Sequence, residues 1–184
     1  MKKKLLLLLV FTLLLVTTGC GKKEEQKGQK VDNTKTIELT DKEFGYKTTF
    51  TYDKSENYSD IEVDTESGRT TEIEFENEEL DVDIEMYYTD AYTETYEGTQ
   101  KSRSAQKYYK EYQFGDYKAY AYGNYGSSIQ LNILIDTDEE NDRAKIIFVS
   151  IDRKDTNEEI IIADVLEQKL KSFFNSIKVE KVSE

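Results

Sequence analysis

Carboxylates are the most abundant side chains able to do chemistry in this chain, which has 38 Asp and Glu against 25 Lys and Arg and no His. Residues 136–142 read Asp-Thr-Asp-Glu-Glu-Asn-Asp and raise the question of a calcium loop. An EF-hand loop needs glycine at its sixth position and glutamate at its twelfth. Asn141 and Ile147 stand there instead. We therefore predict a charged hairpin loop and no metal site.

A second group of carboxylates alternates with apolar residues along two neighbouring segments. Such a stripe is able to bind a basic peptide or a cation, or it is a solvated strand face whose charge discourages edge-to-edge aggregation. We favour the solvated face. The stripe consists of Glu72, Glu74, Glu76, Asp81, Asp83 and Glu85.

Ser104 and Lys107 have the S-x-x-K spacing of a serine acyl-transfer enzyme. The companion S-D-N and K-T-G elements are absent, and the chain is far smaller than that fold. Without histidine the chain lacks the usual general base at neutral pH, and its one cysteine lies near the N-terminus. No phosphate-binding or dinucleotide-binding fingerprint occurs. We predict a protein that is not an enzyme and holds no cofactor.

Tyrosine is concentrated in one region, since most of the 14 tyrosines lie between Tyr87 and Tyr125. Tyrosine combines a flat apolar ring with a polar tip and suits a recognition surface. The alternative is that tyrosine simply fills strand positions for which its β-propensity is high. In residues 117–125, small residues alternate with Tyr120 and Tyr122, so that one face would admit a helix or ligand close to the backbone. The candidate binding surface consists of Tyr109, Tyr117, Tyr120, Tyr122 and Tyr125.

The N-terminus has the features of an export signal. Three lysines precede a 12-residue apolar run from Leu5 to Val16, which is too short to span about 30 Å of hydrocarbon. Thr17-Thr18-Gly19-Cys20 then resembles the lipobox of bacterial lipoproteins, with Thr17 where leucine is usual. The resemblance implies that Cys20 receives a diacylglyceryl group and that residues 1–19 are removed. The mature protein would then be anchored to the outer face of the cell membrane, because two or more acyl chains bind a bilayer stably.

Residues 20–36 follow as the lipidated cysteine and a tether. The segment from Gly21 has one aliphatic residue, Val31, and cannot bury enough apolar surface to offset its ordering entropy. We predict a disordered tether before a single domain over residues 37–184. With a formal net charge of -13, the chain is also expected to repel nucleic acid phosphates.

The domain begins with a period of two. Residues 46–52 and 80–86 alternate apolar with polar side chains, as strands with one buried face do. Asp90 to Gln106 is polar, and we predict a loop there with a short helix. Further strands are expected at 61–63, 73–75, 108–114, 117–125, 129–135 and 144–151, with turns at 67–69 and 77–79.

The period changes near the C-terminus. Apolar residues from Ile161 to Ile177 recur at three- and four-residue spacing, which predicts an amphipathic helix of about five turns. Thr156 with Glu159, or Asp155 with Glu158, would form its capping box. This helix needs a sheet against which to bury its apolar stripe. We therefore predict an α+β fold in which a twisted antiparallel sheet of about six to eight strands packs against the C-terminal helix.

This order of elements, closing on Phe174-Asn175-Ser176-Ile177-Lys178, resembles the PsbP/Mog1-like group of small secreted α+β domains. The aromatic-Pro-x-x-Trp stretch of that group is missing, because the chain has no proline or tryptophan. The resemblance implies a fold and no shared activity.

Three functions are compatible with these features. The first, which we favour, is a non-enzymatic binding module at the membrane surface that contacts a protein, a wall glycan or a small ligand. The second is a carrier of lipid or another hydrophobic ligand, with a cavity between the sheet and the helix at 161–177. The third is a hydrolase, for which no motif is present.

Overall fold

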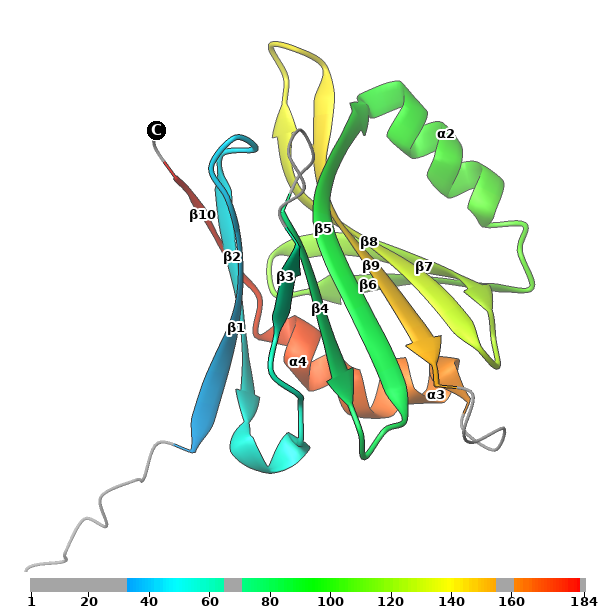
Figure 1. The fold of residues 1–184 in the computed structure, drawn as a ribbon. Coiled ribbons are helices and arrows are strands. Elements are labelled where there is room, and N and C mark those ends of the chain that lie inside the picture. The colour runs from blue at the N-terminus through cyan, green and yellow to red at the C-terminus, as the bar shows by residue number, and fades with distance from the viewer. Residues whose placement is uncertain (1–32, 65–70, 155–160, 183–184) are drawn as a thin grey trace, which may run out of the picture. The chain divides into compact units, whose positions relative to one another are not determined.

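The computed structural model describes residues 33–64, 71–154 and 161–182. Its main layer is a seven-stranded sheet in the order β3-β4-β5-β9-β8-β7-β6, in which all neighbours are antiparallel (Figure 1). These strands are β3 (Glu62–Asp64), β4 (Glu72–Asn77), β5 (Val82–Tyr92), β6 (Tyr108–Phe114), β7 (Tyr117–Asn124), β8 (Ser128–Asp138) and β9 (Arg143–Arg153).

The strands form where the sequence alternates. In β5, Val82, Ile84, Met86 and Tyr88 are buried, and the residues between them are exposed or half-buried. This is the arrangement that the period of two predicts, because successive side chains point to opposite faces of a sheet. The predicted strands at 108–114 and 117–125 are also confirmed.

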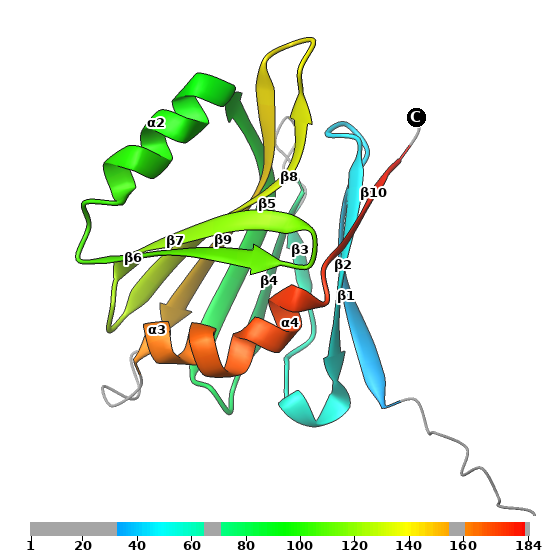
Figure 2. The same ribbon diagram turned by 180° about the vertical axis from the view of Figure 1, so that it is seen from behind.

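The predicted C-terminal helix is confirmed as one continuous helical stretch, although its middle turn is wider than an α-helix. It comprises α3 (Ile162–Val165), a π-helical segment (Leu166–Leu170) and α4 (Lys171–Asn175). Figure 2 shows it lying across the large sheet. Its buried residues belong to the main core, and among them Phe173 and Phe174 are almost completely buried. The α+β fold with an antiparallel sheet against a terminal helix is thus confirmed.

A second, three-stranded sheet was not predicted. It has the order β1-β2-β10, formed by β1 (Thr34–Asp41), β2 (Tyr46–Asp53) and β10 (Lys178–Lys181), and a short 3-10 helix (Lys54–Glu56) follows β2. It closes the core beside the C-terminal helix, where the Phe50 ring stacks on Phe173 at 5.0 Å. Of its strands, β2 was expected from the alternation at 46–52, whereas β1 and β10 were not. These two have a weak pattern of buried apolar residues: β1 buries only Ile37, Leu39 and Asp41, and β10 buries no residue fully. β1 also begins at Thr34, inside the segment assigned to the tether.

The other face of the large sheet carries α2 (Thr93–Arg103), a helix of 11 residues. The helix predicted within residues 90–106 is confirmed, and it takes up most of that segment. Tyr96 is the buried residue of α2, so the helix lacks the apolar stripe by which a periodic pattern is recognised. Helical residues such as Glu94, Gln100 and Arg103 nevertheless lose little entropy in a helix.

Several predictions concern residues outside the described ranges. These are the signal peptide at 1–19, lipidation at Cys20, the tether up to Asp32, the turn at 67–69 and the capping box at 155–159. Among the described residues, no helix is long and apolar enough to cross a membrane.

Candidate functional site

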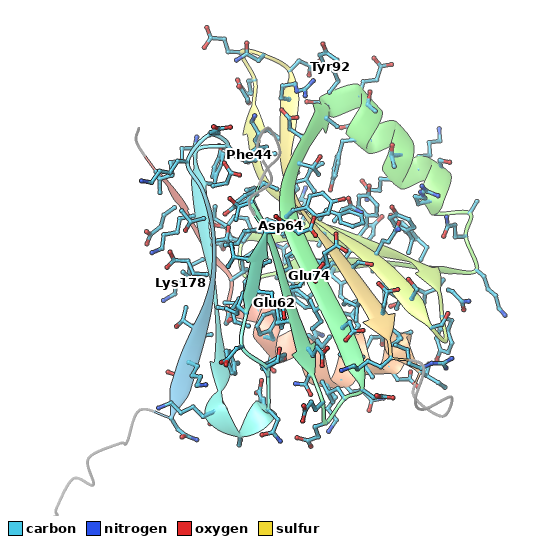
Figure 3. The ribbon with its side chains drawn as sticks, in the orientation of Figure 1. Phe44, Glu62, Asp64, Glu74, Tyr92 and Lys178 are labelled. Atoms are coloured by element: carbon cyan, nitrogen blue, oxygen red, sulfur yellow. The ribbon has the colours of Figure 1, made fainter. Side chains whose placement is uncertain are left out.

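The face of the large sheet that carries α2 is covered over only part of its area. Over β3, β4 and β5 it is lined by carboxylates, which the strand register places in adjoining rows. Glu62 lies opposite Glu74, and Glu74 lies opposite Glu85. Figure 3 shows Glu62, Asp64 and Glu74 over the same strands. We call this surface the acidic face; it consists of Glu62, Asp64, Glu72, Glu74, Glu76, Asp83, Glu85 and Asp152.

Positive charge reaches one end of the acidic face. The Lys154 ammonium pairs with Glu76 and lies 3.8 Å from Asp83. In the described part of the chain, no Lys or Arg forms an ion pair with Glu74 or Glu85. Like charges directly opposite each other on a sheet are destabilising. The part of the acidic face around Glu74 and Glu85 therefore carries negative charge that weakens the fold.

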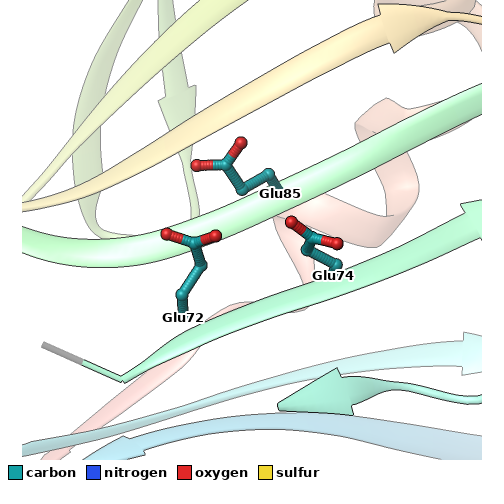
Figure 4. A group of neighbouring side chains, drawn as sticks. All are labelled: Glu72, Glu74 and Glu85. Carbon is teal, nitrogen blue, oxygen red and sulfur yellow. The ribbon is translucent and has the colours of Figure 1, made fainter. Parts of the chain in front are cut away.

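Three of these carboxylates converge. One carboxylate oxygen from each of Glu72, Glu74 and Glu85 lies within 4.8 Å of the other two. Figure 4 shows the three side chains side by side on β4 and β5. Partial burial raises the pKa of Glu85, and the neighbouring charges of Glu72 and Glu74 raise it further. The cluster therefore attracts cations while it opposes its own ionisation.

A cleft of about 630 Å³ adjoins this cluster. Its aromatic lining comes from Phe44, in the turn between β1 and β2, and from Tyr87 and Tyr88 of β5. Phe44 stacks on the buried Tyr88 ring at 5.1 Å and is thereby fixed in place. Tyr87 packs on Phe148 at 5.0 Å and is half-buried. The remaining lining is almost entirely polar and consists of Glu43, Glu72, Glu85, Thr89, Asp90 and Lys145.

One end of the cleft already holds an ammonium group. Lys145 Nζ lies 4.8 Å from the centre of the Phe44 ring and 3.2 Å from a carboxylate oxygen of Asp90. Arg143 donates two hydrogen bonds to Asp90, at 2.7 and 3.1 Å. The Arg143 guanidinium and Lys145 together hold the pKa of Asp90 below its usual range. Asp90 and Glu85, on the same strand, thus have pKa values shifted in opposite directions.

Part of the predicted tyrosine surface lies beneath α2. Tyr120 is 2% exposed and Tyr122 is 7% exposed, and both pack with Tyr96 of the helix. Burial raises the pKa of Tyr120 to about 12. Arg103 of α2 lies over the Tyr122 ring at 4.6 Å, and Gln100 donates a hydrogen bond to the Tyr109 hydroxyl. A partner would reach Tyr120 and Tyr122 only if α2 moved.

The other two predicted tyrosines lie elsewhere. Tyr117 packs against the main core, and Tyr125 is 43% exposed with its hydroxyl donating to Asp164. The five candidates therefore do not form one surface. The aromatic residues of the cleft, Phe44 and Tyr87, were not selected from the sequence. The sequence did carry a signal for Tyr87. It follows Glu85 by two residues in the alternating run, which places Tyr87 on the same solvated face of the strand as Glu85.

The remaining sequence candidates are accounted for by local contacts. In the 136–142 segment, Asp136 accepts hydrogen bonds from Tyr46 and Lys181, and Asp138 accepts from Asn141. Their oxygens are directed to protein groups. The Ser104 hydroxyl donates to the Lys101 carbonyl at the end of α2.

No family model, curated protein or solved structure matches this chain. The argument for its function therefore rests on its own residues.

Proposed function

We propose that this protein is a non-enzymatic binding module, anchored through Cys20 to the outer face of the cell membrane, and that it contacts its partner through the acidic face and the adjoining cleft. The observation that carries the proposal is the set of like charges facing one another across β3, β4 and β5. Solubility requires net charge but does not require carboxylates in directly opposed pairs. A partner that relieves their repulsion would gain binding free energy from it.

The proposed absence of catalysis is supported by the side chains in the cleft. They are carboxylates, aromatic rings, a threonine and Lys145, whose ammonium is already engaged by Asp90. Among these described side chains, no threonine or tyrosine hydroxyl donates a hydrogen bond to a carboxylate that could act as its general base.

The carrier function has less support. It needs under-filled apolar space between the sheet and the C-terminal helix. The aromatic rings there are close-packed. The centre of the Phe173 ring lies 5.0 Å from the ring centre of Phe50, 5.9 Å from that of Phe75 and 5.2 Å from that of Phe174. The cleft that we describe lies instead beside β5, where its pairing with β4 ends at Glu72 and Tyr87, and most of its lining is polar.

The anchor is tested by Cys20→Ser in the full precursor. We expect the protein to leave the membrane fraction, because the thiol that would carry the diacylglyceryl group is lost. Thr18→Ser, which keeps a small residue before the cysteine, is the matched control and should remain in the membrane. An unchanged membrane fraction for Cys20→Ser would count against lipidation.

The binding surface is tested by site-specific photocrosslinking in the producing cell. A photoreactive amino acid at position 74 lies on the acidic face, and one at position 139 lies at an exposed turn on the β8–β9 hairpin. We expect a discrete adduct from position 74 and none of the same mass from position 139. Identical products from both positions, or none from position 74, would contradict the proposed surface.

A further inference from the structure

We propose that the partner is a basic polypeptide, and that the cleft beside Phe44 and Tyr87 receives one of its lysine or arginine side chains. This inference rests on the binding function proposed above and names the chemical class of the partner. It is carried by the cleft, by the aromatic rings that line it, and by a lysine of the chain itself that is bound there.

Lys145 shows how the cleft holds an ammonium group. Its Nζ lies over the Phe44 ring and beside the Asp90 carboxylate. An aromatic face attracts a cation through its quadrupole, and a nearby carboxylate adds charge attraction. Phe44 and Asp90 supply both elements at this end of the cleft.

The other end offers the same elements, and no Lys or Arg of the described residues forms an ion pair with Glu85 there. Tyr87 is half-buried against Phe148, and register places it opposite Glu72 and two residues from Glu85. The Tyr87 ring and the carboxylates of Glu72 and Glu85 therefore line the same cleft. We propose that the partner supplies positive charge to this end.

The spacing of the acidic face favours an extended polypeptide over a single ion. Side chains on one face of a strand repeat every two residues, or about 6.6–6.8 Å. Glu72, Glu74 and Glu76 follow that repeat along β4. A basic segment in extended conformation has the same repeat, so alternate side chains would lie over successive rows. The cleft is also far larger than a bare cation requires.

The test measures binding of fluorescein-labelled octalysine to the protein purified from membranes in neutral detergent, by fluorescence anisotropy at about 0.15 M salt. The key variant is Glu74→Gln/Glu85→Gln. The matched control is Glu139→Gln/Glu140→Gln, which makes the same change of net charge at an exposed turn. We expect the first pair to weaken binding about tenfold and the control pair to weaken it less than about twofold, because screening limits the effect of distant charges.

A second variant tests the aromatic contribution. Tyr87→Leu keeps apolar volume and removes the aromatic quadrupole, and we expect it to weaken octalysine binding about threefold. Phe148→Leu is the control, because Phe148 supports Tyr87 but does not line the cleft. A Tyr87→Leu variant that binds as tightly as the unchanged protein would remove the ring from the proposal.

Three outcomes would overturn the inference. Equal losses in the two double variants would show that net charge alone attracts the peptide. Displacement of octalysine by stoichiometric Ca²⁺ would identify the three-glutamate cluster as an ion site. Absence of octalysine binding, while the position 74 adduct persists in cells, would leave the binding module standing and exclude a basic partner. If the adduct also fails to form, both proposals fall.

Discussion

The two faces of the seven-stranded sheet differ in what covers them. One face packs against the C-terminal helix and the three-stranded sheet, and nearly all of its side chains are fully buried. The other has α2 over a small tyrosine-rich cluster, and the acidic face beside it is open. The same strands build both faces, because successive side chains alternate in direction.

This contrast separates stability from recognition. The face that packs against the C-terminal helix supplies most of the buried apolar area, and such burial dominates the free energy of folding. The other face is then free to carry charge that weakens the fold, because the stability lost through charge repulsion is small against the stability gained from apolar burial. Four predictions test this division, in order of decreasing expected effect.

The largest effect is expected for Phe173→Ala. Phe173 is 1% exposed and contacts the rings of Phe50, Tyr58 and Phe174. Truncating a buried aromatic residue should lower the free energy of unfolding by about 3–5 kcal/mol. Urea denaturation measures this loss. A loss below that for Tyr96→Ala would contradict the assignment of the main core to this face.

Tyr96→Ala should have a smaller effect, about 1–2 kcal/mol. Tyr96 is the buried residue of α2, and the helix can detach locally without opening the main core. Hydrogen exchange should therefore show lost protection in α2 and retained protection in β8 and β9. Global loss of protection would show that both clusters unfold as one unit.

Asp90→Asn should cost about 1 kcal/mol at neutral pH, because it breaks partly buried ion pairs with Arg143 and Lys145. The folded-state pKa of Asp90 is lowered, so its contribution is present above the usual Asp pKa of about 3.9 and is lost as pH falls through the lower folded value. The difference in unfolding free energy between the variant and the unchanged protein should therefore shrink in acid. Asp116→Asn, in an exposed turn, is the control and should change little at any pH.

Glu85→Gln should have the smallest effect, and of opposite sign: a gain of about 0.5 kcal/mol at neutral pH. The folded-state pKa of Glu85 is raised, so ionisation opposes folding. The cost is absent below the usual Glu pKa of about 4.3 and develops as pH rises through the raised folded value. Stability curves of the two proteins should therefore converge in acid and separate towards neutral pH. Destabilisation by Glu85→Gln at neutral pH would mean that the charge is compensated.

Strong periodicity was sufficient to predict much of the fold. The alternation in 80–86 predicts the buried row of β5, and the three- and four-residue spacing after Ile161 predicts the terminal helix. Both signals depend on local geometry, which is set by residues near one another in sequence. The polar segment 93–103 lacks such a signal, and the extent of α2 was missed for that reason.

The candidate site was less predictable. The sequence suggested five tyrosines, of which Tyr120 and Tyr122 lie under α2 and Tyr117 and Tyr125 lie apart from them. The cleft instead brings together Phe44 and Tyr87, which are far apart in the chain. Spacing along a sequence does not report such proximity.

By itself, the sequence determined the face on which each side chain of β4 and β5 points, and hence that Glu72, Glu74 and Glu85 would be wet. Only the tertiary structure decided which wet residues meet. Strand register pairs Glu74 with Glu85, and the turn between β1 and β2 brings Phe44 onto Tyr88. The physical reason is that side-chain direction follows from local backbone geometry, whereas register and the packing of turns depend on contacts between distant parts of the chain.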